Sequence, residues 1–124
     1  MNLYLLDGAF AVCRLDPSAR MPDWAMFAPF VSITRTTDEL SIVVEEAKVP
    51  EQIKAERGWR CLKVEGPLDF AETGILASLA APLAVAKISI FAVSTFDTDY
   101  LLIKEGDLES ALHTLTESGH NLRD

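Results

Sequence analysis

The sequence predicts an α+β fold in which a strand-rich first half precedes a second half ordered β-α-β-β-α-β. Two observations predict it. In the first half, short apolar runs come in pairs joined by polar turns. In the second half, apolar residues recur at helical spacing from Gly74 and again after Asp107. The pattern changes at a charged segment ending in Gly58, so we expect domains at residues 1–57 and 58–124.

The first half is predicted to form two β-hairpins. Asp7-Gly8 suits the positive φ angles of a two-residue turn and joins the first pair of apolar runs. A polar segment from Thr36 to Glu39 joins the second pair. The expected elements are strands at residues 3–6, 9–15, 30–35 and 40–46, and a turn or short helix at residues 23–28 and again within residues 49–57.

The second half is predicted to hold four strands and two helices. Their expected ranges are strands at 59–65, 88–93, 100–104 and 120–123, and helices at 74–86 and 107–118. Pro82 lies inside the first helix and should kink or split it near Ser78. Asp107 suits the N-cap of the second helix, and Gly119 suits the C′ position that ends it. This order is the split βαβ, or ferredoxin-like, arrangement: an antiparallel sheet with two helices on one face.

Composition narrows the classes of function. The chain has 124 residues and a formal net charge of −8, from 11 basic and 19 acidic side chains. Lys and Arg are scattered singly, so we expect no nucleic-acid partner. No apolar run is long enough to span a membrane and the first residues lack the basic start of a signal peptide, so we expect a cytoplasmic location and no membrane partner. Cys13 and Cys61 lie within apolar strand patterns and are predicted to be buried free thiols.

The turn from Ser94 to Asp99 combines hydroxyls, an aromatic ring and two carboxylates between strands that are otherwise almost entirely apolar. A solvated turn is one interpretation, in which Asp97 and Asp99 cap backbone N–H groups. The other is a binding site, because a partly shielded carboxylate pairs well with an ammonium group. No phosphate loop, nucleophile elbow or metal-ligand spacing occurs in the sequence, so we expect no enzyme, no metal and no cofactor.

A second candidate element is the start of the first helix. There the free N–H groups of Gly74, Ile75 and Leu76 would point outward with the positive end of the helix dipole, which suits a carboxylate. Glycine also allows a ligand to approach the backbone closely. The alternative is that Gly74 only eases the loop into the helix.

The segment from Lys87 to Leu112, with its STFDTD turn, resembles the C-terminal part of the ACT domain. The resembling subfamily is typified by cytosolic arginine sensors and small bacterial tandem-ACT proteins. The resemblance implies tandem ferredoxin-like ACT units, the first one degenerate and strand-rich. It implies an amino-acid pocket in which Asp99 is the acid best placed for the ligand. The implied ligand-binding residues are Gly74, Ile75, Leu76, Ser89, Ile90, Thr95, Phe96, Asp97 and Asp99.

The resemblance implies a regulatory or sensory protein that binds an amino acid at an interface between ACT units, within one chain or in a homodimer. Binding would act on a regulated partner protein through a conformational change. A second hypothesis is an interaction module whose pocket is vestigial and whose sheet serves only to dimerise. A third is an acyl-phosphate hydrolase on the same fold, but the segment from Glu65 to Gly74 lacks the arginine that would cradle the phosphate.

Overall fold

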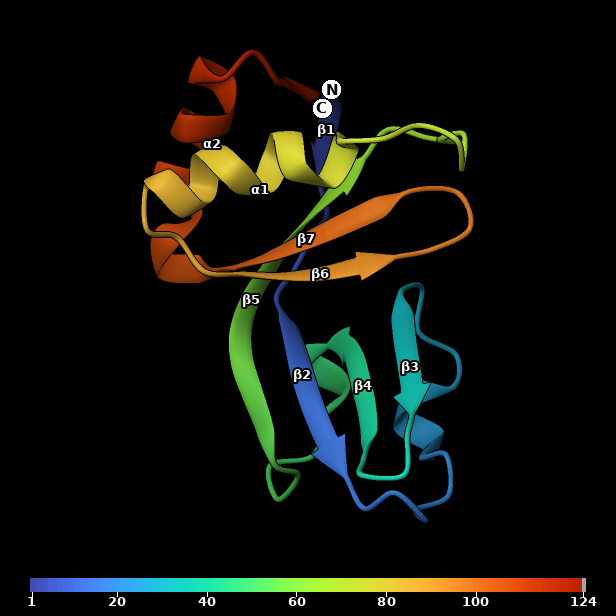
Figure 1. The fold of residues 1–124 in the computed structure, drawn as a ribbon. Helices are drawn as coiled ribbons and strands as arrows, with labels where there is room; N and C mark the ends of the chain where they lie inside the picture. The colour runs from blue at the N-terminus through green and yellow to red at the C-terminus, as the bar shows by residue number, and fades with distance from the viewer. Residues whose placement is uncertain (124) are drawn as a thin grey trace. The chain divides into compact units, whose positions relative to one another are not determined.

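The computed structural model describes residues 1–123, which form two compact units (Figure 1). The C-terminal unit consists of Met1–Asp7 and the chain from Arg60 onward, and the middle unit is Gly8–Trp59. The middle unit ends at Trp59, two residues beyond the predicted division after Arg57. The first seven residues differ from the prediction, because they fold with the C-terminal residues.

The C-terminal unit contains an antiparallel hairpin, two α-helices and three further strands. Its elements are β1 (Asn2–Leu5), the second part of β5 (Ala55–Val64), α1 (Ile75–Val85), β6 (Ile90–Ser94), β7 (Asp99–Lys104), the 3-10 turn η3 (Glu105–Asp107), α2 (Leu108–Glu117) and β8 (Asn121–Arg123). The strands lie in the order β6-β7-β5-β1-β8. From β5 onward the chain follows the predicted β-α-β-β-α-β order, which confirms the ferredoxin-like prediction.

The predicted hairpin across Asp7-Gly8 is wrong. β1 pairs antiparallel with β5, where Leu3 lies opposite Val64, and parallel with β8, where Leu3 lies opposite Leu122. Gly8 does adopt the expected positive φ of 80°, but the chain passes there from one unit into the other. Burial explains the outcome, because Leu3 is completely buried in the core of the C-terminal unit.

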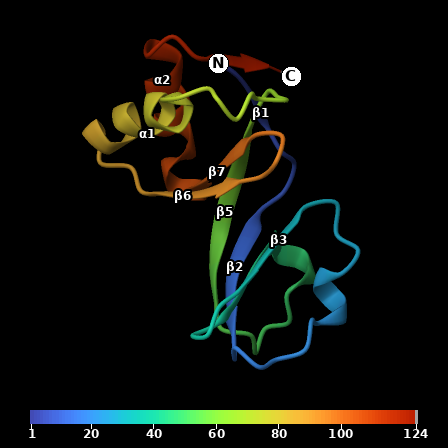
Figure 2. The ribbon, with the colours of Figure 1, turned by 45° about the vertical axis from the view of Figure 1, so that its right-hand side comes forward.

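One face of this sheet carries both helices (Figure 2). The core beneath them joins apolar side chains from every layer of the unit: Leu3, Leu62, Val64, Leu79, Leu83, Ile88, Leu101, Ile103, Ala111 and Leu115. Leu79 and Leu83 of α1 and Ala111 and Leu115 of α2 are buried in it. The spacing of four along each helix places both members of a pair on the same face.

Helix α1 runs through Pro82 as one element, so of the predicted kink or split near Ser78 the split is wrong. Pro82 has no N–H to donate to the carbonyl of Ser78. The ring nitrogen Nε2 of His120 lies 3.1 Å from that carbonyl oxygen and, when protonated, donates to it instead. His120 is buried and follows Gly119, which has φ 96° and ends α2 at the predicted C′ position.

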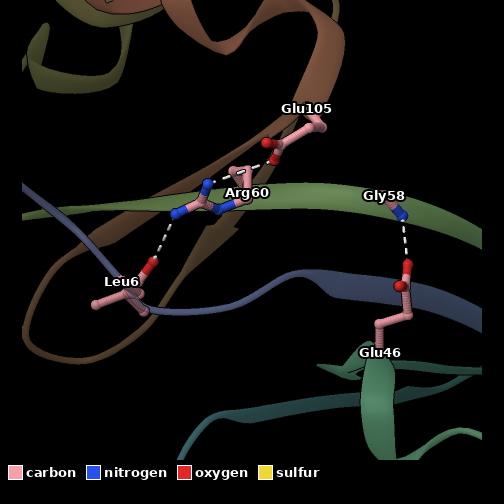
Figure 3. A network of polar contacts seen from close by, with 5 residues as sticks. All are labelled: Leu6, Glu46, Gly58, Arg60 and Glu105. Carbon is pink, nitrogen blue, oxygen red and sulfur yellow. Dashed lines mark hydrogen bonds and ion pairs between the residues drawn. The ribbon is translucent and has the colours of Figure 1, made fainter.

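Asp107 stands at the predicted N-cap position of α2, but its side chain makes no capping hydrogen bond. The backbone enters α2 through the 3-10 turn η3. At the start of this turn Glu105 accepts a hydrogen bond from Arg60, whose other Nη reaches the carbonyl of Leu6 (Figure 3). The Arg60–Glu105 pair is partly exposed at 3.4 Å, so its contribution to stability is modest, about 0–1 kcal/mol.

The middle unit is a four-stranded sheet in the order β3-β4-β2-β5. Its elements are β2 (Phe10–Leu15), the 3-10 turn η1 (Asp23–Ala25), β3 (Val31–Arg35), β4 (Leu40–Glu45), the 3-10 turn η2 (Glu46–Lys48) and the first part of β5. The β3–β4 hairpin confirms the second predicted hairpin, closed by a Thr36 N–H to Glu39 carbonyl bond of 2.9 Å. η1 confirms the predicted helical turn.

Strand β5 begins at Ala55, four residues before the predicted strand. Its pairing with β2 shifts register near Gly58, which has φ 80°. The carboxylate of Glu46 accepts the Gly58 N–H at 2.7 Å (Figure 3). Glycine at this position tolerates the irregular backbone of a bulge, which the alternation of apolar residues did not reveal.

Both cysteines are buried free thiols, as the sequence predicts. Burial raises the pKa of Cys13, and it raises the pKa of Cys61 to about 12. Among the described residues, no helix is long and apolar enough to cross a membrane.

Candidate functional site

The candidate site is a cleft of about 280 Å³ in the C-terminal unit. Two segments far apart in the sequence line it: the loop from β5 into the first turn of α1, and the β6–β7 turn. Figure 1 shows both segments at the same end of the unit. The lining residues are Leu68, Asp69, Phe70, Glu72, Gly74, Ile75, Leu76, Ser94, Thr95, Phe96, Asp97, Thr98 and Asp99.

The start of α1 forms one wall. Gly74 is the N-cap in a left-handed conformation, with φ 76°. Its carbonyl accepts the Ser78 N–H at 2.8 Å, and no side chain of residues 1–123 caps this end of the helix. A Cβ added at Gly74 would meet no atom within 4 Å, so the requirement for glycine comes from φ and not from crowding. Because this end of α1 has no side-chain cap, its first N–H groups are available to an anion.

The β6–β7 turn forms the other wall, and hydrogen bonds fix its shape. Ser94 and Asp99 are paired across the hairpin, and Ser94 Oγ donates to Asp99 Oδ1 at 2.6 Å. Thr95 N–H donates to the Thr98 carbonyl at 2.8 Å, which closes the turn. Thr98 is buried, and its hydroxyl donates to the carbonyl of Val64 in β5 at 2.6 Å. The turn is thereby anchored to the sheet.

The loop and the turn are also attached to each other. Leu68 N–H donates to the Asp97 carbonyl at 2.6 Å. A Cβ at Gly66 would lie 2.9 Å from that same carbonyl oxygen, so the loop passes too close to the turn for a larger residue. Further out, the rings of Phe70 and Phe96 meet edge to face with centroids 4.9 Å apart. The two walls thus form one continuous surface.

All the charged residues that line the cleft are acidic. Asp69, Glu72, Asp97 and Asp99 line it, and no lysine or arginine is among its lining residues. Glu72 Oε1 accepts the Asp69 N–H at 3.2 Å, while Asp99 is oriented by Ser94. The carboxylates, which come from both walls, and the helix N–H groups at the start of α1 complement a molecule that carries an ammonium and a carboxylate.

Seven of the nine predicted site residues line the cleft together: Gly74, Ile75, Leu76, Thr95, Phe96, Asp97 and Asp99. Ser89 and Ile90 do not line it. Ser89 is exposed ahead of β6, and Ile90 pairs with Ile103 at the far end of the hairpin from the turn. Ile90 packs against the core instead.

Sequence reasoning did not name the other six lining residues as site residues: Leu68, Asp69, Phe70, Glu72, Ser94 and Thr98. Phe70 and Glu72 lie in a loop of mixed polarity with no periodicity to interpret. Thr98 belongs to the turn that was singled out, and a threonine between two aspartates signals a hydroxyl near backbone groups. Within residues 1–123, no group of three or more His, Cys, Asp or Glu side chains is arranged to hold a metal ion.

Comparisons with known proteins agree with this architecture. The profile of the ACT domain family matches residues 54–117, and a profile describing another family's N-terminal domain matches residues 8–52. A Bos taurus protein, the cytosolic arginine sensor for mTORC1 subunit 1, is 35% identical over 98 residues, covering 69% of this chain and 30% of the sensor. The chain thus spans less than a third of the length of that relative.

Solved structures share the fold of this chain. A crystal structure of an Agobacterium tumefaciens protein is 45% identical, with a TM-score of 0.93, and covers 98% of this chain and 91% of that one. The regulatory subunit of aspartate kinase from Thermus thermophilus is 11% identical with a TM-score of 0.60, covering 92% and 94% of the two chains, which shows a shared fold. Because the profile of the ACT domain family matches residues 54–117, more than half of the chain, the chain belongs to the ACT domain family.

Proposed function

We propose that this protein is an ACT-domain regulator that binds a small amino acid in the cleft between the start of α1 and the β6–β7 turn. The observation that carries the proposal is the juxtaposition of Gly74 and Asp99 in that cleft. The free N–H groups at the helix start receive the α-carboxylate, and Asp99 receives the α-ammonium. Both contacts are charge-assisted hydrogen bonds, which are stronger than neutral ones.

The charge of the cleft favours a ligand with an additional positive charge. A zwitterion uses one of the four lining carboxylates for its ammonium, which leaves Asp69, Glu72 or Asp97 for a cationic side chain. The Bos taurus relative is by name an arginine sensor, so arginine is the first amino acid to test. Its cytosolic location also supports a cytoplasmic location for this chain.

The regulatory output of this protein is a change in its association with another chain. In the described residues, β6 pairs only with β7, so its other edge lacks a strand partner. Such an edge is a template for pairing with a second copy, which gives a homodimer through the sheet. A ligand bound beside the β6–β7 turn then stabilises that edge and shifts the equilibrium between the assembly and a regulated partner protein.

Thermal-shift titration with the twenty amino acids tests the proposal. A ligand at a hundredfold excess over Kd adds about 2.7 kcal/mol to the stability of the native state. Asp99→Asn removes the charge yet keeps an acceptor for Ser94 Oγ, so it should abolish the shift without unfolding the protein. Asp38→Asn, on the exposed β3–β4 turn, is the matched control and should leave the shift unchanged.

Two outcomes would reject the proposal. One is the absence of a shift with any amino acid at millimolar concentration, which would favour the interaction module with a vestigial pocket. The other is a shift that Asp99→Asn and Asp38→Asn leave equally intact, which would move the binding site away from the cleft. Native mass spectrometry with and without ligand measures the predicted dimer.

A further inference from the structure

Two highly exposed phenylalanines, Phe70 and Phe96, line the cleft. Phe70 is 73% exposed and Phe96 is 79% exposed. They come from different walls, and they meet edge to face with ring planes at 88°. Aromatic rings carry a large apolar area whose exposure to water is unfavourable, so a partner that covers them gains free energy.

The local structure keeps Phe70 at this position. The Leu68 N–H to Asp97 carbonyl bond ties the loop to the turn two residues before Phe70. Asp69 then folds the loop back, because its carboxylate accepts the Ala71 N–H at 2.8 Å. Phe70 is therefore held at the cleft by a hydrogen-bonded turn, in contact with Phe96, and the acidic residues Asp69 and Glu72 of the same loop also line the cleft.

We propose that Phe70 contacts the aliphatic stem of the bound amino acid, and that this contact makes the cleft select for side-chain length. The inference rests on the proposed function. The Gly74 and Asp99 walls hold the two α-substituents that all amino acids share, so they do not distinguish one ligand from another. The apolar surface of Phe70, which is in contact with Phe96, increases the affinity for each methylene that lies between the α-carbon and the terminal cation.

A homologous series of ligands measures this contact. Diaminobutyrate, ornithine and lysine carry the same two ammonium groups and differ by one methylene at each step. In the wild-type protein, calorimetric titration should show Kd falling by about two- to fourfold per methylene, as burial of a methylene group predicts. Phe70→Ser should flatten this dependence, and Phe70→Tyr, which keeps the ring, should retain it.

Phe27→Ser is the matched control. Phe27 is also highly exposed, at 90%, but it belongs to the middle unit and does not line the cleft. Its substitution should leave the affinities and their dependence on length unchanged. Because the dependence on length is a ratio between ligands, a variant that merely lowers stability does not alter it.

The outcomes separate this inference from the proposed function. Binding that does not strengthen with length in the wild type, or that strengthens equally in Phe70→Ser, overturns the role of Phe70 and leaves the amino-acid site intact. The same holds if Phe27→Ser flattens the series as much as Phe70→Ser does. If no member of the series and no other amino acid binds, both proposals fail together.

Discussion

Among single residues, Thr98 connects the candidate cleft to the sheet. Its hydroxyl donates to the Val64 carbonyl at 2.6 Å, and its side chain is only 3% exposed. Thr98→Val keeps the shape but leaves a buried acceptor without this donor, so it should lower the free energy of unfolding by about 1–3 kcal/mol. Urea denaturation measures the loss. Thr98→Ser retains the hydroxyl and should lose less; equal losses in the two variants would remove the hydrogen bond from the account.

A second residue, Glu65, gives stability a dependence on pH. Hydrogen bonds from Asn2 Nδ2 at 2.6 Å and from the Tyr4 hydroxyl at 3.1 Å lower the pKa of its carboxyl group. The native state therefore favours the ionised form more than the unfolded chain does. Its contribution is present above the ordinary glutamate pKa and is lost as pH falls through the lowered native value.

Urea denaturation of Glu65→Gln between pH 6 and pH 3 tests this coupling. The variant should lose less stability than the wild type as the pH falls, because it lacks the group whose proton affinity differs between the two states. Glu51→Gln, on an exposed turn, is the matched control and should follow the wild type. Parallel curves for Glu65→Gln and the wild type would contradict the coupling.

At the scale of elements, α1 depends on a contact that local sequence rules do not predict. Pro82 in the sequence predicts a kink or split, yet the helix is not split there. The compensation comes from His120, 42 residues after Ser78, whose ring reaches the carbonyl that Pro82 leaves free. No local pattern announces such a contact, because it exists only after both helices have packed on the sheet.

A double-mutant cycle tests this compensation. His120→Ala should lower the free energy of unfolding by about 1–3 kcal/mol, because it leaves the Ser78 carbonyl without a donor. In a Pro82→Ala background the backbone N–H of residue 82 returns, so the same substitution should cost clearly less. Chemical denaturation of the four proteins gives the coupling free energy. A cost of His120→Ala that is identical in both backgrounds would contradict the account.

The candidate site divides between features that sequence reveals and features that only packing reveals. The helix start at Gly74 and the turn around Asp99 carry local signals: a glycine before a helical pattern and a charged turn between apolar strands. Phe70 and Glu72 lie on a loop without periodicity, so their contribution appears only once the Leu68–Asp97 hydrogen bond has joined the loop to the turn. The resemblance to the ACT domain supplied Ser89 and Ile90, which line no part of the cleft.

For the whole molecule, β1 is the element that sequence placed incorrectly. Its alternation predicts a strand, and Asp7-Gly8 predicts a neighbouring hairpin partner. In the structure β1 lies between β5 and β8 instead. Its apolar side chain Leu3 completes the core under the helices. Strand periodicity identifies a buried face but not the sheet position that buries it.

Leu3→Ala tests this topology. Leu3 is fully buried in the core shared with Leu62 and Leu115, so the substitution should lower the stability of the C-terminal unit by about 2–5 kcal/mol. Amide hydrogen exchange should report the loss in α2 and β8. Ile42→Ala, which empties an equally buried position in the middle unit, should act on β2 to β4. Loss of protection in β2 to β4 with Leu3→Ala would instead support the hairpin.

The central claim is that the cleft between the start of α1 and the β6–β7 turn binds an amino acid, and a backbone amide NMR titration with arginine tests it most directly. The account predicts saturable shifts concentrated at Gly74, Ile75 and Leu76 and at the turn from Thr95 to Asp99. These shifts should disappear in Asp99→Asn and persist in Asp38→Asn. Saturable shifts that are confined to residues outside the cleft would contradict the claim. It would also be contradicted if millimolar arginine left the spectrum unchanged while another amino acid shifted amides elsewhere.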